Sequence, residues 1–233
     1  MSKVYLFNSL SSYNSIFAVI AAYEKARNNS EEKTCILDLN ITRSEVALIS
    51  GKLSPEIGNY ISQYYPNIDL DGLKQNKYSF KVDTHTTAID LYIKTSTDKS
   101  IKDKIEDIVY DVINILKSEY DTIIVISKNN YYDKIAEISD KIILTVNNIT
   151  STEIKSAIDF IRHIPHDKLE NRIKFIIYKN ANISEGVNKL IISNAQKYSS
   201  EIIKVDEMPD IISKIEWFQD YSALHDINLN IID

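Results

Sequence analysis

The sequence predicts a doubly wound α/β fold, in which a mostly parallel central sheet carries helices on both faces. Short apolar runs, typical of strands buried on both faces, recur along the chain. Segments with apolar residues at helical spacing separate these runs. No internal repeat or low-complexity linker interrupts the alternation over the 233 residues, so a single domain spanning residues 1–233 is expected.

The first part of the chain predicts a strand, a loop, a helix and a second strand. Residues 4–7 form an apolar run with β-favouring side chains, and residues 16–25 have helical periodicity. A second strand at 35–37 leads directly to Asp38. In such a unit the loop before the helix, here residues 9–15, is where phosphate would bind, because free N–H groups and the helix dipole point there. This loop contains no glycine.

The alternation of strands and helices continues to the end of the chain. Fully apolar runs at 122–126 and 141–146 are typical of central strands, whereas 78–82 and 89–93 alternate like exposed or edge strands. Further strands are predicted at 173–178 and 202–205. Helices are predicted at 44–50, 56–65, 101–116, 132–138, 151–163, 185–198 and 210–221.

Composition limits the classes of function. The formal net charge of −6 argues against general nucleic-acid binding, which needs a basic surface. No apolar run approaches the roughly 18 residues of a membrane span, and residues 1–3 lack a signal-peptide layout. A soluble cytoplasmic protein is therefore expected. The single cysteine, Cys35, lies within a predicted buried strand and is expected to be a small hydrophobic residue rather than a reactive thiol.

Taken in order, these segments resemble the ParA/MinD group of deviant P-loop ATPases. That family has a strand, a K-G-G-x-G-K-T loop, an alanine-rich helix and a second strand ending in D-x-D. The corresponding segments here are residues 9–15, 18–26 and 35–40. Residues 120–126 resemble the family's Y-D-x-V-I-I-D strand, and residues 139–146 resemble its A-D-E-V-I-I-P-V strand. The resemblance covers nearly the whole chain and implies a P-loop NTPase-like fold that dimerises across its nucleotide loops.

Within this resemblance, the phosphate loop lacks the glycines and lysines of the motif. Leu10, Ser11 and Tyr13 stand at the glycine positions. A loop that cradles phosphate needs glycine so that backbone N–H groups can converge without interference from Cβ atoms. Ser9 and Asn14 stand at the two lysine positions, so neither cation is supplied.

The residues that would hold the metal ion are only partly kept. Ser15 matches the hydroxyl that holds Mg²⁺, and Asp38 matches the first aspartate of D-x-D. Asn40 replaces the second aspartate, and Ile126, followed by Ser127, stands where the metal-associated aspartate is expected. A charge-assisted contact contributes about 1.5–3 kcal/mol, so these losses remove most of the expected affinity for ATP-Mg²⁺. Hydrolysis depends even more strongly on positioned charge.

The resulting interpretation is a degenerate ParA/MinD-like ATPase, a pseudo-ATPase that acts as a non-catalytic binding, scaffolding or positioning protein. The CpaE/TadZ branch, which serves pilus or secretion assembly, is the nearest subgroup by resemblance. No cofactor and no metal site are expected. Residual, weak cofactor or anion binding is assigned to the hydroxyl, amide and carboxylate side chains near the loop, Ser11, Ser12, Asn14, Ser15 and Asp38.

Protein partners are expected, including a homodimer formed through the degenerate loop face by apolar and tyrosine contacts. Tyr131 and Tyr132, at the family's switch position, are the candidate interaction residues. Membrane association is expected only through a partner. The alternative is an active ATPase of partitioning or localisation, using ATP and Mg²⁺, in which Lys128 replaces a missing lysine. His163 and His166 are interpreted as a helix end rather than as metal ligands.

Overall fold

The computed structural model describes residues 2–10, 13–40, 45–50, 79–92, 99–128, 133–147, 151–164, 169, 171–178, 184–205, 224 and 226–232. The strands are β1 (Lys3–Asn8), β2 (Thr34–Asn40), β3 (Ser79–Lys81), β4 (Thr86–Tyr92), β5 (Thr122–Ser127), β6 (Lys141–Asn147), β7 (Ile173–Tyr178) and β8 (Glu201–Val205). The helices are α1 (Tyr13–Asn28), α2 (Glu45–Ile49), α5 (Lys99–Leu116), α6 (Asp133–Ile138), α7 (Ser151–His163) and α8 (Glu185–Ala195).

The described strands form one sheet in the order β3-β4-β2-β5-β1-β6-β7-β8. All of its pairings are parallel except that of β3 with β4. The first strand lies in the middle, between β5 and β6. The chain completes the half of the sheet on the β2 side before it crosses to β6, so the strand order reverses at β1. In open α/β sheets, ligands bind outside the carboxyl ends of the strands at such a reversal.

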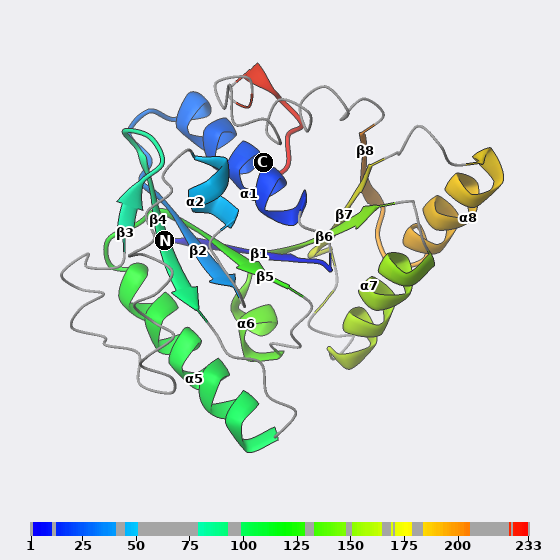
Figure 1. Cartoon of the computed structure of the whole chain (residues 1–233), viewed down its shortest axis with the longest axis horizontal. Coiled ribbons are helices and arrows are strands. Elements are labelled where there is room, and N and C mark those ends of the chain that lie inside the picture. The colour runs from blue at the N-terminus through cyan, green and yellow to red at the C-terminus, as the bar shows by residue number, and fades with distance from the viewer. Residues whose placement is uncertain are drawn as a thin grey trace.

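Helices cover both faces of the sheet, which confirms the predicted doubly wound fold. Figure 1 shows α1 and α2 on one face and α5, α6, α7 and α8 on the other. The β5 side chains alternate between the two layers: Ile124 and Ile126 pack in the core under α1, and Ile123 and Val125 in the core under α5. A strand that is buried on both faces needs apolar residues at every position, and this explains the uninterrupted apolar runs.

Helix α1 is buried along most of its length. Ala18, Ala21 and Ala22 are completely buried against the sheet. Their small side chains let the helix pack closely over the central strands, and the alanine-rich sequence therefore reflects packing as well as helix propensity.

The strand predicted at 89–93 is not an edge strand. β4 begins earlier, at Thr86, and lies between β3 and β2, with Ala88 and Ile89 buried. The alternation at 89–93 was misleading because it reports how side chains face the two layers, and not whether other strands pair with both edges of the strand. The other edge prediction is confirmed by β3, which pairs only with β4 among the described strands. The helices predicted at 56–65 and 210–221 lie outside the described residues.

Residues 227–232 lie against α1, close to the end of the chain marked in Figure 1. The buried Glu24 carboxylate accepts hydrogen bonds from the backbone N–H groups of Leu229, Asn230 (3.0 Å) and Ile231 (2.9 Å). Asn230 has φ 51°, in the left-handed region, and such a turn lets successive N–H groups converge on one anion.

Candidate functional site

The carboxyl ends of β5, β1 and β6 are joined by one buried amide, the side chain of Asn14. Its Nδ2 atom donates to the carbonyl oxygens of Phe7 (3.0 Å) and Ser127 (3.2 Å). Its Oδ1 atom accepts from the Thr145 hydroxyl at 3.1 Å. Asn14 is completely buried, so this position contributes fixed hydrogen bonds inside the fold instead of a charge directed at a ligand.

Ser9, at the other lysine position, also bonds within the fold. Its hydroxyl donates to the Thr145 carbonyl at 2.6 Å, and its backbone N–H donates to the Ser127 carbonyl at 3.2 Å. Leu10, the next residue, is 45% exposed. At the described start of the loop, the apolar side chain of Leu10 therefore faces the surface, and the hydroxyl of Ser9 points into the sheet.

Tyr13, at a glycine position of the resembled motif, packs on an aromatic cluster. Its ring meets Tyr178 edge-on, with 4.6 Å between centroids and an interplanar angle of 72°. Phe17 lies on the same Tyr178 ring, at 6.1 Å. Tyr178 is the last residue of β7, so these rings close the space between the start of α1 and the carboxyl end of that strand.

The hydroxyl of Ser15 is bonded to a carboxylate. Ser15 is completely buried, and its Oγ atom donates to Glu45 Oε2 at 2.8 Å. The other oxygen of Glu45 accepts from the Lys128 ammonium in an ion pair. The Lys128 and Glu45 side chains are 25% and 17% exposed, so water screens this pair only partly. A hydroxyl, a carboxylate and an ammonium thus form a chain across α1, α2 and the end of β5.

Asp38 holds α2 in the position that lets Glu45 reach both Ser15 and Lys128. The Asp38 side chain is buried, and its Oδ2 atom accepts from the backbone N–H of Val46 at 3.3 Å. Val46 is the second residue of α2 and follows Glu45 directly. A carboxylate at a helix N-terminus satisfies an otherwise unbonded N–H group and interacts favourably with the helix dipole.

The structure brings together three predicted site residues, Asn14, Ser15 and Asp38, at the carboxyl edge of the sheet. Ser11, Ser12, Tyr131 and Tyr132 lie outside the described residues, so their assigned roles stay predictions. Sequence reasoning missed Glu45, although an acidic residue opening the short helix after the Asp38 strand was a usable signal.

The predicted helix end at His163 is confirmed, since α7 ends there and the His163 ring nitrogen Nδ1 lies 2.6 Å from the Asp159 carbonyl oxygen. His166 lies outside the described residues. Within the described ranges, no group of three His, Cys, Asp or Glu side chains converges as a metal site. In the same ranges, no helix combines the length and the apolar composition needed to cross a bilayer. Cys35 is buried as expected, and burial raises the pKa of its thiol.

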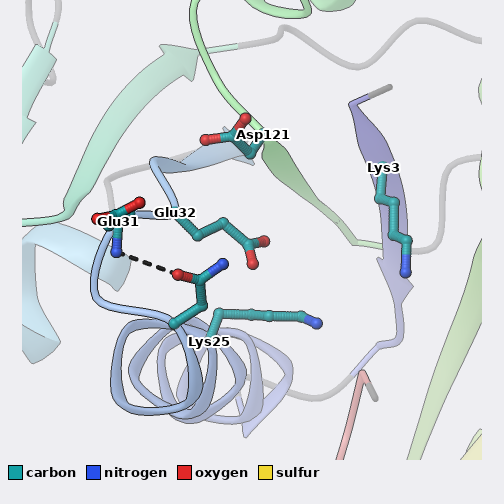
Figure 2. Close-up of a pocket in the computed structure, with 6 residues that line it drawn as sticks. Lys3, Lys25, Glu31, Glu32 and Asp121 are labelled. Atoms are coloured by element: carbon teal, nitrogen blue, oxygen red, sulfur yellow. Dashed lines mark hydrogen bonds between the residues drawn. The ribbon is translucent and has the colours of Figure 1, made fainter.

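Two cavities open at the opposite, amino-terminal edge of the strands. One, of about 380 Å³, is shown in Figure 2 and is lined by Lys3, Lys25, Asn29, Glu31, Glu32 and Asp121. Two of these side chains accept hydrogen bonds from the backbone nearby: Asn29 accepts from the Glu31 N–H, and Asp121 accepts from the Lys33 N–H. The second cavity, of about 530 Å³, lies under the β3–β4 turn and includes His85 and Tyr120. Neither cavity adjoins Ser15.

Comparison with known proteins gives matches only at the level of structure. No protein-family model matches the chain, and no curated protein matches it. It is similar to a ParA family ATPase from Chlorobium tepidum TLS, with TM-score 0.65, 16% identity, and coverage of 95% of this chain and 91% of that chain. A plasmid partition protein from Borrelia burgdorferi B31 bound to AMPPNP gives TM-score 0.62 at 16% identity, covering 99% and 93%.

A third similar structure is MinD in the MinC:MinD cell division protein complex of Aquifex aeolicus, with TM-score 0.58, 17% identity, and coverage of 94% of this chain and 87% of that chain. These likenesses extend over nearly the full length of each protein. The chain therefore has the ParA/MinD-type fold of P-loop ATPases, as the sequence resemblance predicted.

Proposed function

We propose that this chain is a ParA/MinD-like protein without ATPase activity, which works in the cytoplasm as a single domain for binding, scaffolding or positioning. The observation that carries the proposal is the buried amide of Asn14. At a position where the resembled motif has lysine, this side chain is uncharged and has its bonds within the sheet, to Phe7, Ser127 and Thr145. It offers neither charge nor reach to a phosphate group.

Loss of charge at two other positions of the resembled nucleotide site, one in the loop and one in β5, supports the same proposal. Ser9 also bonds inward, and the apolar Ile126 is buried where a metal-associated aspartate is expected. Each lost contact to a charged group is worth about 1.5–3 kcal/mol. Phosphoryl transfer depends on several such contacts acting together, so hydrolysis is affected more strongly than binding.

A protein-binding role is consistent with the proteins that share the fold. Those reported above include a plasmid partition protein and a MinD in complex with MinC. We propose that this chain also binds protein partners, including a second copy of itself, through the loop face that carries the exposed Leu10. Tyr131 and Tyr132 stay the predicted interaction residues of this proposal. Pilus or secretion assembly is the proposed setting, with any membrane association made through a partner.

Calorimetric titration with ATP and ADP, with and without Mg²⁺, tests the absence of nucleotide chemistry. The expected result is no saturable heat at millimolar nucleotide, and an oligomeric state by light scattering that ATP does not change. Mg²⁺-dependent hydrolysis that is lost in Asp38→Ala would contradict the proposal.

One observation favours the alternative of an ATPase with a non-standard loop. Lys128 and the Ser15 hydroxyl bond to the two oxygens of the same Glu45 carboxylate, so this ammonium is a candidate replacement for a missing lysine. This alternative requires saturable Mg²⁺-ATP binding to the unmodified protein, abolished by Lys128→Ala.

A further inference from the structure

The Glu45 carboxylate occupies the space between two donors at the carboxyl edge of the sheet. One oxygen accepts from Ser15, and the other accepts from Lys128. Ser15 lies in the first turn of α1, and Lys128 directly follows β5. A hydroxyl and an ammonium that converge on two oxygens of one anion are the kind of donors that also bind phosphate oxygens.

The position of this carboxylate is fixed by its own helix. Glu45 is the first residue of α2, and the hydrogen bond from Val46 to the buried Asp38 holds that helix end against the carboxyl end of β2. Two donors and their anion are therefore supplied by three separate segments of the chain, and a fourth, β2, holds the anion's helix in place. The carboxylate is held in place before any ligand arrives.

We propose that Glu45 is a tethered anion that closes a phosphate-binding position formed by Ser15 and Lys128. With the carboxylate removed, the two donors bind one phosphate group of a small phosphate anion or nucleotide. The inference rests on the proposed function, because it explains how the unmodified protein keeps this position closed to nucleotide.

The strength of the expected competition follows from the tether. A group attached through a short segment acts at an effective concentration of about a millimolar or more. The carboxylate is also negatively charged like phosphate. Glu45 therefore both fills the binding position and repels a phosphate group electrostatically. Removal of Glu45 is therefore expected to lower the dissociation constant for phosphate at least about tenfold.

The test compares inorganic phosphate and ATP, both without metal, as calorimetric ligands of the full chain. Glu45→Ala is expected to bind inorganic phosphate at least about tenfold more tightly than the unmodified protein. Glu45→Gln, which keeps an acceptor for Ser15 but loses the charge, is expected to show a smaller gain and carries the test if the alanine variant does not fold. Lys128→Ala in the Glu45→Ala background is expected to abolish the gain.

Glu185→Ala is the matched control. Glu185 is also the first residue of a helix and forms an ion pair with Lys189 at 2.8 Å, but it lies on α8. Its removal changes the net charge equally and is expected to leave phosphate affinity unchanged.

Equal affinity in Glu45→Ala and the unmodified protein overturns the inference, as does an equal gain in Glu185→Ala. A comparable gain for ATP and inorganic phosphate shows recognition of one phosphate group, whereas a gain for ATP alone overturns that assignment. Tight Mg²⁺-ATP binding by the unmodified protein refutes the proposed function instead and leaves the metal-free phosphate comparison to decide the inference.

Discussion

Glu24 is predicted to be the residue that keeps residues 227–232 on the fold. The perturbation is Glu24→Ala, which removes the acceptor of three backbone N–H groups. Each bond to a charged group contributes about 2 kcal/mol, and the Lys174 ammonium adds a fourth such bond to the Asn230 carbonyl at 2.7 Å. Burial of Ile231 and Ile232 contributes about 2 kcal/mol each.

These gains total about 12 kcal/mol, and the exposed hydrogen bond from Arg27 to the Ile227 carbonyl adds little because water screens it. Ordering six residues at about 1.5 kcal/mol each costs about 9 kcal/mol. The net free energy that holds the segment on the fold is therefore about 3 kcal/mol, which is less than the contribution of about 6 kcal/mol from the three hydrogen bonds to Glu24. Glu24→Ala is expected to release the segment. The free energy of unfolding then falls by about 3 kcal/mol, because the rest of the fold stays intact and loses only the net free energy with which the segment was bound.

Amide hydrogen exchange together with urea denaturation measures both effects. The N–H groups of Leu229, Asn230 and Ile231 are expected to lose protection in Glu24→Ala, while β1 and β5 keep theirs. Glu24→Gln keeps one acceptor oxygen but turns its NH₂ group toward the Ile231 N–H, so an intermediate loss of about 2 kcal/mol is expected. Glu31→Ala, at an exposed position, is the control. Unchanged protection at 229–231 in Glu24→Ala would refute the reasoning.

Three further predictions concern other buried side chains. Asn14→Ala leaves two carbonyls and a hydroxyl without this partner. It is expected to lower the free energy of unfolding, measured in urea melts, by about 2–4 kcal/mol. The control Asn28→Ala, at an exposed position of the same helix, is expected to change it by less than about 0.5 kcal/mol. Burial raises the pKa of Glu106 above 4.5, although the hydrogen bonds from the backbone N–H groups of Lys134 and Ile135 in α6 act to lower it. The stability that Glu106 contributes through this shift is therefore present at low pH and is lost as the pH rises through the raised pKa. Glu106→Gln keeps one oxygen for both N–H groups and should therefore flatten the pH dependence of melting above pH 4.5 while Glu106→Ala destabilises at every pH; a parallel dependence in Glu106→Gln and the unmodified protein contradicts this. Cys35 is expected to react with a thiol reagent only after denaturation, and rapid reaction of the folded protein would show that β2 opens locally.

The sequence by itself determined most of the fold. The uninterrupted apolar runs at β5 and β6 specified central strands, because only strands covered on both faces need apolar side chains at every position. The helical periodicity of α1 and α5 is equally local, since it depends on which residues within one helix face the sheet. β4 was misplaced because the alternation at 89–93 reports only how its side chains face the two layers, and only the pairing with β2 and β3 shows that the strand lies inside the sheet.

The tertiary structure alone decided what the loop residues do. From sequence, Asn14 could be recognised as a missing lysine, but its bonds reach Ser127 and Thr145, 113 and 131 residues away. The Glu45 carboxylate meets partners 30 and 83 residues distant. Such contacts are set by strand order and by the place of α2 on the sheet, and no local pattern of side chains encodes them. The physical reason is that periodicity reports how one segment faces the core, whereas a site depends on which segments the folded chain brings side by side.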